Sequence, residues 1–274
     1  MKILSIIFVL VFIGSLLIII FSRSVILLDY LYLFIFKKPA FVHFLWRKPR
    51  ELSSLDKQFL NHNFPFYKRL PQKKKKVFEH RIISFIADKE FQGRDGIIIT
   101  EEMKLWVAAT AIMLTFGMRN YKLPMLEIVL IYPDIYLSTV TKKYHKGEYN
   151  PYMRALVFSW KDFQQGYNIH NDNLNLGIHE FIHLIQINSY KKGDISAVIF
   201  TDTSKEIIRL LADETIRENL LKADYFRAYA FTNRVEFLAV LVEYFIESPT
   251  IFKEKFPAFY FKIREMLNYN FIGY

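Results

Sequence analysis

The sequence predicts a mostly helical α+β domain with a small β-sheet, preceded by an N-terminal transmembrane helix. Three observations support this fold class: an uncharged apolar run at the N-terminus, short strand-like segments in the first two thirds of the chain, and a helical pattern after residue 173. Short strands mixed with helices and then followed by helices alone are typical of α+β folds. We expect residues 1–22 to be a transmembrane anchor, 23–50 a basic juxtamembrane or interfacial segment, and 51–274 the globular domain.

The N-terminal segment from Ile3 to Phe21 carries no charge and is long enough to cross about 30 Å of hydrocarbon as a helix. A cleaved signal peptide is the alternative. The apolar run is longer than the roughly 7–15 residues usual in signal peptides, and "FSRS" stands where a small-x-small cleavage site is expected. We therefore expect an uncleaved, single-pass anchor.

A second apolar run, residues 25–36, is too short to span a bilayer and is interrupted by Asp29. It is expected to lie along the membrane as an interfacial helix, followed by a basic stretch in which Trp46 suits the headgroup region. More lysines and arginines follow the anchor than precede it. The positive-inside tendency then predicts that the large C-terminal part is cytoplasmic.

The basic charge of the chain is concentrated near this anchor. The net charge is +10, and the first 50 residues hold seven lysines and arginines against one acid, which leaves +6 there and +4 in the remainder. This distribution favours a membrane surface as the partner. The lysine run at 73–76 lacks an aromatic-interleaved face, so no nucleic-acid partner is expected.

The globular part has the composition of a folded domain with a large core. Hydrophobic residues make up 52% of the chain, with 27 Phe and 17 Tyr, which argues against disorder. There is no cysteine, so disulfides, thiolate nucleophiles and cysteine-held metals are excluded. Any metal in this protein must be held by histidines and carboxylates.

The elements of the domain follow from apolar periodicity and from Gly and Pro boundaries. The predicted strands are 96–100 ("GIIIT"), 126–133 ("LEIVLIYP") and 153–160 ("MRALVFSW"). The predicted helices are 72–91, 101–117, 174–190, 203–222, 233–247 and 255–268.

The segment "HEFIH" at 179–183 carries the main chemical signal. His179 and His183 lie four residues apart, so both imidazoles project from one face of a helix and can reach the same ion. Neutral imidazole is a good zinc ligand, and a glutamate directly after the first ligand, here Glu180, can accept a proton from a water molecule at the metal.

The surrounding helix is apolar except for one polar stripe, formed by Asn175, His179, His183 and Gln186. Such a stripe on a buried helix predicts the floor of a cleft. The alternative is that both histidines are core residues bonded to the backbone or to carboxylates. Among the other histidines, His170 is nearest in sequence, but it lies in an Asn-rich loop and is expected only to rim the site.

A third ligand is expected from the helix at 233–247. This helix is apolar nearly throughout, yet it carries Glu236 and Glu243 two turns apart on one face. A buried carboxylate needs a partner, and a metal ion and the N–H of a ligand histidine are two natural ones. The alternative is that this face is simply exposed. Spacing alone leaves open which glutamate would contact the metal.

At this point the sequence resembles the MtfA family of zinc-dependent peptidases. The resemblance spans about residues 52 to 268 and rests on several segments in shared order: "FPFYKRLPQ", "FQGRDGIIITEEMKLWVAATAIMLTFG", "LEIVLIYP", "LVFSWKDFQQG", "NLNLGIHEFIHLI" and "AYAFTNRVEFLAVLVEYFIESPTIFKEKFP". It implies a zincin-like metalloprotease domain of the gluzincin type, related to the catalytic domains of lethal-factor-type toxins.

The resemblance also implies roles for individual residues. In the family, Zn²⁺ is held by the two motif histidines and by a downstream glutamate that follows a tyrosine by seven positions, and "YAFTNRVE" supplies Tyr229 and Glu236 at that spacing. The implied zinc ligands are His179, His183 and Glu236. Glu180 is implied as the general base, and Tyr229 as the hydroxyl that stabilises the oxyanion.

Two residues near the site are assigned outside this pattern. Helix geometry suggests that Glu243 supports a ligand without touching the metal. Gln186 stands where the family usually has an aspartate, so it keeps hydrogen bonding but loses the charge, and a change in substrate preference or metal affinity is expected. The N-terminal span is also not typical of the soluble members.

The sequence thus favours a membrane-anchored, zinc-dependent metallopeptidase that acts on a peptide or protein substrate. The alternative is a zinc-containing regulatory protein that captures a cytoplasmic protein partner with little or no hydrolysis, since MtfA-like proteins are known for binding a transcriptional repressor. A third interpretation is a membrane-tethered structural domain without stoichiometric metal.

Overall fold

The structure is a computed structural model that describes residues 2–36, 38–40, 42–43, 49–169, 172–191 and 194–269. The chain divides into two compact units, Met1–Val42 and His43–Tyr274, which are described separately. His170 and Trp46, both considered above, lie outside the described residues.

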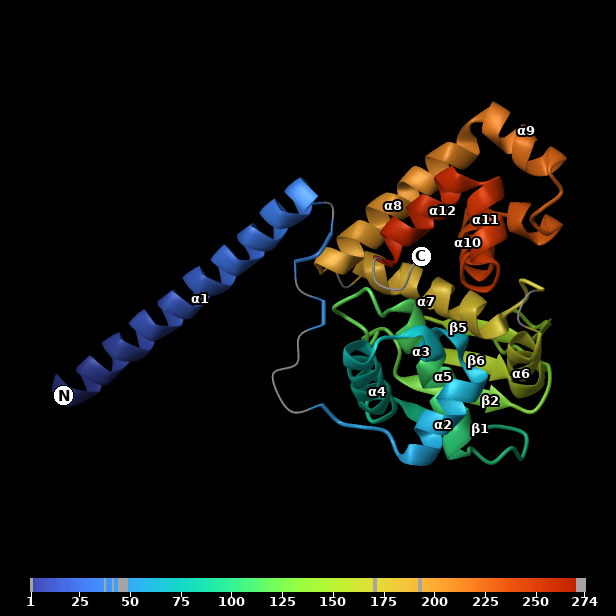
Figure 1. The fold of residues 1–274 in the computed structure, drawn as a ribbon. Helices are drawn as coiled ribbons and strands as arrows, with labels where there is room; N and C mark the ends of the chain where they lie inside the picture. The colour runs from blue at the N-terminus through green and yellow to red at the C-terminus, as the bar shows by residue number, and fades with distance from the viewer. Residues whose placement is uncertain are drawn as a thin grey trace. The chain divides into compact units, whose positions relative to one another are not determined.

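The first unit is built on one helix, α1 (Lys2–Phe36), drawn in blue in Figure 1. Almost all of its apolar side chains are exposed, and it is long and apolar enough to cross a membrane. The structure differs from expectation in one respect, because the helix continues past residue 22 and residues 25–36 do not form a separate helix. At 1.5 Å per residue, α1 is about 52 Å long, which is more than the roughly 30 Å thickness of a hydrocarbon layer.

The second unit is an α+β domain, as the sequence predicts, and its main sheet has the strand order β1-β2-β6-β5. The strands are β1 (Glu90–Gly93), β2 (Ile128–Tyr132), β5 (Gly147–Asn150) and β6 (Ala155–Ser159). The first three in spatial order are parallel, and β5 runs antiparallel to β6 at the edge. A separate two-stranded ladder joins β3 (Tyr136–Leu137) to β4 (Tyr144–His145). The predicted strands at 126–133 and 153–160 are β2 and β6.

The strand predicted at 96–100 is wrong. The parallel partner of β2 is instead Glu90–Gly93, and residues 97–100 form an irregular extended segment. The chain turns at Gly96, which has φ +81°, and folds back until the Ile97 carbonyl lies against Gly93. Ile97 and Ile99 pack against the core, so the three isoleucines in a row reflect partial burial and not strand pairing.

The helices of the domain surround this sheet and extend the fold away from it (Figure 1). The helices that precede β2 in the sequence are α2 (Ser54–Asn63), α3 (Pro65–Arg69), α4 (Gln72–Ile86) and α5 (Glu101–Leu114). The helices that follow β6 are α6 (Trp160–Asn168), α7 (Leu176–Lys191), α8 (Ile195–Ala212), α9 (Glu214–Lys222), the short 3₁₀ helix η1 (Ala228–Phe231), α10 (Arg234–Glu247), α11 (Pro249–Lys255) and α12 (Pro257–Met266).

The helix predicted at 203–222 is two helices. α8 begins earlier, at Ile195, and ends at Ala212, after which Asp213 caps α9 by accepting a hydrogen bond from the Ile216 N–H. An aspartate at this position is a strong helix-start signal because its carboxylate satisfies an otherwise unpaired amide. The apolar periodicity of the sequence continues across Asp213, so it predicted one helix where the structure has two.

Helix α7 is the centre of the domain. It packs against α5, α6, β5 and β6 on one side and against α8 and α10 on the other, as Figure 1 shows. Phe181, Ile182 and Ile185 of α7 are fully buried. Because α7 is fixed from both sides, polar side chains along it are held in defined positions.

Candidate metal centre

Two helices position the candidate ligands. His179 and His183 project one turn apart from α7, and Glu236 lies in the first turn of α10. The start of α10 is fixed by Asn233, whose side chain accepts hydrogen bonds from the amides of Val235 and Glu236. This cap locates the backbone of Glu236 directly, since capping orients the first helical turn.

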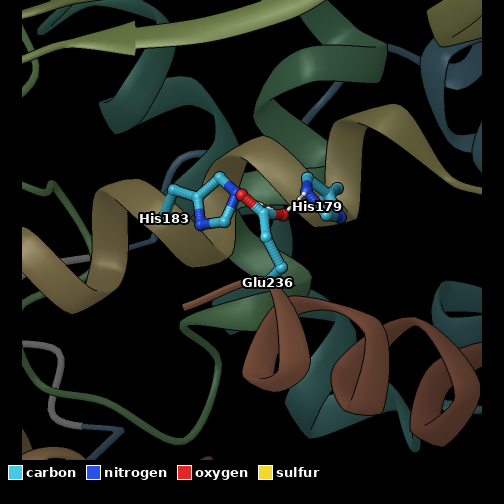
Figure 2. Close-up of side chains that lie close together, drawn as sticks. All are labelled: His179, His183 and Glu236. Carbon is cyan, nitrogen blue, oxygen red and sulfur yellow. Dashed lines mark hydrogen bonds and ion pairs between the residues drawn. The ribbon is translucent and has the colours of Figure 1, made fainter. Parts of the chain in front are cut away.

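The three side chains converge on one point (Figure 2). One ligand atom from each of His179, His183 and Glu236 lies within 4.8 Å of the other two. Glu236 Oε2 is 2.8 Å from His179 Nε2 and 3.4 Å from His183 Nε2. His179 and Glu236 are 57 positions apart in the sequence, so only the packing of α10 on α7 brings them together.

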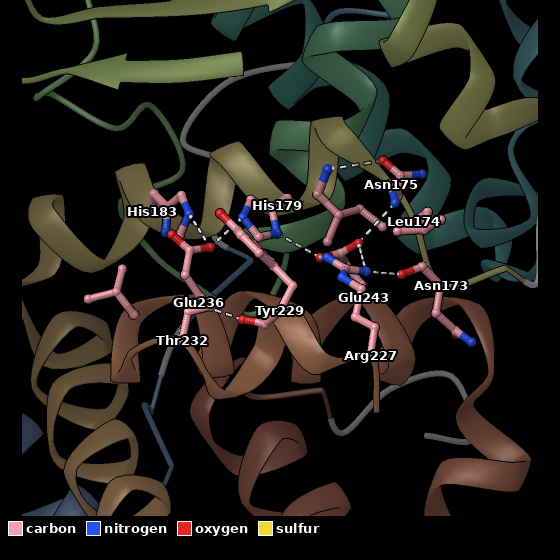
Figure 3. Close-up of polar contacts among 12 residues, drawn as sticks. Asn173, Leu174, Asn175, His179, His183, Arg227, Tyr229, Thr232, Glu236 and Glu243 are labelled. Atoms are coloured by element: carbon pink, nitrogen blue, oxygen red, sulfur yellow. Dashed lines mark hydrogen bonds and ion pairs between the residues drawn. The ribbon is translucent and has the colours of Figure 1, made fainter. Parts of the chain in front are cut away.

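Glu243 holds the far side of His179 (Figure 3). Its Oε1 accepts from His179 Nδ1 at 2.7 Å, and its Oε2 accepts from the backbone N–H of Asn175 at 3.0 Å. Arg227 donates to both carboxylate oxygens, at 2.7 and 3.0 Å. With Nδ1 bonded to Glu243, the Nε2 of His179 faces Glu236, to which it is hydrogen-bonded at 2.8 Å, and is the nitrogen that could bind a metal ion.

These contacts shift the acid–base properties of the site. Burial by itself lowers the pKa of His179, but hydrogen bonds to Glu236 and Glu243 outweigh it and raise that pKa to about 9. Burial favours the neutral form of Glu236, yet the two histidines hold its pKa well below its usual range. In the metal-free protein the site therefore carries a proton on His179, which a metal ion must displace.

Glu180 lies beside the histidines and is buried. It packs against Gly147 of β5, where an added Cβ would lie 2.6 Å from Glu180 Cγ. Burial raises the pKa of Glu180, and the neighbouring histidines oppose that shift. A carboxylate with a raised pKa is a better proton acceptor, which suits a general base.

Tyr229 reaches over the site from η1 (Figure 3). Its ring centroid lies 5.9 Å from that of His179, and its side chain is 49% exposed. Burial, together with the nearby Glu236 carboxylate, raises the pKa of Tyr229 to about 12. The hydroxyl therefore stays protonated and can donate a hydrogen bond at neutral pH.

The site opens into a cavity of about 490 Å³. His179, Glu180, Tyr229 and Glu243 line it together with residues 144–147, which lead from β4 into β5. A cavity of this size admits several residues of an extended peptide or a small ligand.

Gln186, the last residue of the polar stripe on α7, bonds to backbone. Its amide is 3.5 Å from the Val235 carbonyl, and within the described part of the chain it makes no hydrogen bond to a candidate ligand. It lies one turn beyond His183, where α7 passes the start of α10, so its nearest polar group is backbone and not the metal site.

The donor set fits a tetrahedral zinc ion. Ligands at about 2.0–2.1 Å from zinc lie roughly 3.3 Å from one another in a tetrahedral site, close to the 2.8 and 3.4 Å found between Glu236 Oε2 and the two histidine nitrogens. Two imidazoles and one carboxylate also leave a fourth position free for a substrate or water, as in catalytic zinc sites.

Comparison with known proteins agrees with this geometry. The family model of the glucose-regulated metallo-peptidase M90 matches residues 45–268. The chain belongs to this family. An uncharacterized protein of Synechocystis sp. is 23% identical over 240 residues, covering 75% of this chain and 85% of that protein. Mlc titration factor A of Serratia proteamaculans is 23% identical over 208 residues, covering 64% of this chain and 72% of that protein. The resemblance to the MtfA family is thereby confirmed.

In this M90 metallopeptidase domain two further residues support the candidate ligands. Asn175 was expected as part of the polar stripe but without a contact to Glu243, and Arg227 was not expected at the site. Arg227 pairs with Glu243, and Asn175 both donates to Glu243 and accepts from the Ile178 N–H at the start of α7. A signal for Asn175 was present, because asparagine just before a helix is a preferred cap. For Arg227 the only hint was that a buried Glu243 would need a cation.

Proposed function

We propose that this protein is a membrane-anchored zinc peptidase that hydrolyses peptide bonds through a water molecule activated at the site. The proposal depends mainly on one observation: the ligand atoms of His179, His183 and Glu236 meet within 4.8 Å while the buried carboxylate of Glu180 stands beside them. Membership of a metallopeptidase family supports the same conclusion.

The proposed reaction uses the protein's own groups for proton transfer. A zinc ion, when bound, polarises the scissile carbonyl and lowers the pKa of a water molecule. Glu180 accepts a proton as that water attacks and delivers it to the departing amine. The raised pKa of Glu180 supports both halves of this transfer, because the base must also act as an acid.

Tyr229 is proposed to stabilise the oxyanion. Its hydroxyl is protonated, and its ring lies beside that of the candidate ligand His179, with the ring centroids 5.9 Å apart, which supports this role. A single donor to a developing oxyanion contributes on the order of 10²–10³ in rate.

The edge strand β5 is suited to hold a peptide substrate. It pairs with β6 on one side, and among the described residues no strand pairs with its other side. Gly147 of β5 lines the cavity and touches Glu180. An extended peptide could add to this edge through main-chain hydrogen bonds, which would bring its backbone next to the base.

The apolar helix α1 is proposed to anchor the protein as a single-pass membrane segment, with the domain on the cytoplasmic side. The length and hydropathy of α1 support the anchor. The excess of lysine and arginine after the span supports the orientation.

Metal analysis of the purified full chain, combined with peptide hydrolysis, tests this proposal. We expect close to one zinc per chain and hydrolysis that stops when the metal is chelated. The variant Glu180→Gln should keep the zinc but lose hydrolysis, whereas the exposed control Glu254→Gln should behave as wild type. Zinc-free protein, or a Glu180→Gln variant that cleaves at the wild-type rate, would refute the assignment.

A second candidate function is the capture of a regulatory protein partner at the same cavity. The name of the Serratia relative describes that protein as a titration factor for Mlc, which favours this possibility for a family member. If capture is the function, Glu180→Gln should retain partner binding while zinc removal abolishes it, and fluorogenic peptides should not be cleaved by either form.

A further inference from the structure

The ladder of β3 and β4 carries an unusual concentration of exposed apolar side chains. Ile135, Leu137, Val140 and Tyr144 are 48% to 71% exposed. Outside α1, no other ten-residue stretch among the described residues exposes as many large apolar side chains. Single exposed apolar residues are ordinary, but a group of them marks an interaction surface.

The geometry of the ladder puts three of these side chains on one face, and the fourth, Val140, lies in the turn that joins the two strands. Leu137 is directly opposite Tyr144 across the two strands, and Ile135 lies two residues before Leu137, so all three point the same way. Tyr136, between them, points inward and stacks on Tyr132 with ring centroids 4.6 Å apart. Ile135, Leu137 and Tyr144 therefore share the outward face because successive side chains of a strand point to opposite sides.

Hydrogen bonds of Ser138 define the turn between the strands. Ser138 Oγ accepts from the amides of Val140 and Thr141, and the Ser138 backbone pairs with Lys142 and Lys143. An apolar tip that is preorganised in this way loses little conformational entropy when it binds.

The charge around this apolar face is positive. Residues 133–146 contain three lysines and one aspartate, and two of these four form ion pairs outside the ladder: Asp134 with Lys161 and Lys146 with Asp162. Lys142 and Lys143 are exposed beside Val140 and make no ion pair within the described residues. Apolar side chains flanked by lysines match the chemistry of an anionic lipid surface, with acyl chains below and negative headgroups above.

We propose that the face formed by Ile135, Leu137, Val140 and Tyr144, with Lys142 and Lys143 at its edge, docks on an anionic membrane surface. The chain carries its own membrane-type helix, so the domain meets lipid at a high effective concentration and a weak contact suffices. Residues 144–147 also line the active-site cavity, so docking brings the mouth of the cavity to the membrane. Resting on the proposed peptidase function, this assigns as substrates polypeptide segments that lie at a lipid surface.

The absence of cysteine allows a direct test on the full chain. Val140→Cys, labelled with an environment-sensitive fluorophore, is reconstituted into phosphatidylcholine vesicles with or without phosphatidylglycerol. The matched control is Ile98→Cys, a residue that is 83% exposed and lies outside this face. We expect blue-shifted emission and quenching by spin-labelled lipid for the Val140 probe only, strongest with phosphatidylglycerol and reduced by high salt or by Lys142→Gln with Lys143→Gln.

Three results would overturn the proposal. The Val140 probe could be as exposed to water as the Ile98 probe in both vesicles. Equal burial of the Val140 probe in both vesicles would refute the preference for anionic lipid. A loss of hydrolysis of a water-soluble peptide in Ile135→Ser with Val140→Ser would show that the face binds peptide. The fluorescence result does not depend on catalysis, so it stays informative even if the protein proves not to be a peptidase.

Discussion

At the residue scale, Glu243 is the group that organises the candidate site. It is almost fully buried, and its two oxygens accept from His179, Asn175 and Arg227. A carboxylate that accepts the second N–H of a metal-binding histidine fixes the orientation of the ring and increases its basicity. Arg227 offsets the cost of burying this charge, which would otherwise be several kcal/mol.

Substitution of Glu243 should therefore weaken metal binding without touching a ligand. We expect Glu243→Gln to lower zinc affinity roughly 10–100-fold, as is common when such a partner is lost. Competition with a fluorescent chelator measures the affinity. Glu254→Gln, at an exposed position of α11, is the control and should bind zinc as wild type does. Equal affinity in Glu243→Gln and wild type would show that His179 needs no such support.

Glu247 offers a prediction about pH. Burial raises its pKa to about 8 from an ordinary value near 4.5, with hydrogen bonding to Asn175 acting in the opposite direction. The folded protein thus keeps this proton at pH values where the unfolded chain has lost it, so stability falls as pH rises from about 4.5 through 8.

Replacing Glu247 with glutamine should remove this loss. We expect Glu247→Gln to be more stable than wild type at pH 9 by about 1–3 kcal/mol, the usual cost of an imperfectly solvated polar group, with a much smaller difference at pH 4. Thermal melts across this range give the measurement. Parallel stability curves for the two proteins would mean that the Glu247 carboxylate is well solvated.

At the element scale, the contact between β5 and α7 sets the position of Glu180. Gly147 has no side chain, and the Glu180 side chain occupies the space that a Cβ would take. Strand and helix come this close only because the strand residue is glycine. The edge strand thereby defines one wall of the cavity and the location of the proposed base.

A methyl group at this position should displace the base. We expect Gly147→Ala to reduce kcat by about 10-fold or more, because a shift of about 1 Å in a catalytic group can cost on the order of 10² in rate. Zinc content should stay at the wild-type level, since the atoms nearest to the added methyl group belong to Glu180 and Leu176 and not to a candidate ligand. A higher KM with unchanged kcat would instead indicate that the methyl group obstructs the substrate.

At the scale of the whole molecule, α1 is longer than a bilayer requires. Its first part, Ile3 to Phe21, is free of charge, whereas the remainder contains Arg23 and Asp29. A charge in the membrane centre is costly, by roughly 2.5–3.5 kcal/mol on insertion scales. The uncharged part is therefore expected to span and the remainder to lie at or beyond the headgroups.

Paired arginine substitutions test this division of α1. Leu16→Arg should make much of the protein extractable from membranes by alkaline carbonate, whereas Leu31→Arg should leave it membrane-integral. Fractionation and immunoblotting provide the readout. If Leu31→Arg is the more disruptive change, the spanning segment lies nearer the C-terminal end of α1.

Much of the fold was predictable because its signals are local. Apolar periodicity gave α5, α7 and α10 nearly to their ends, and β2 and β6 followed from short apolar runs with clear boundaries. The errors occurred where local signals were ambiguous. The run at 97–99 is apolar enough for a strand, but the segment that pairs with β2 is Glu90–Gly93. No local pattern in the sequence indicates that choice.

The sequence by itself determined that His179 and His183 share a helix face and that Ile3 to Phe21 is an uncharged apolar run long enough to span a membrane, because both depend on side chains within a few turns of one another. Spacing left open which of the two glutamates would meet the histidines, and the family resemblance implied Glu236. Only the tertiary structure brings Glu236 to the histidines and bonds Glu243 to Nδ1 of His179 and to Arg227. Two glutamates on one helix face are equivalent in sequence. They become different when α10 packs on α7 at one crossing point, which a local pattern does not encode.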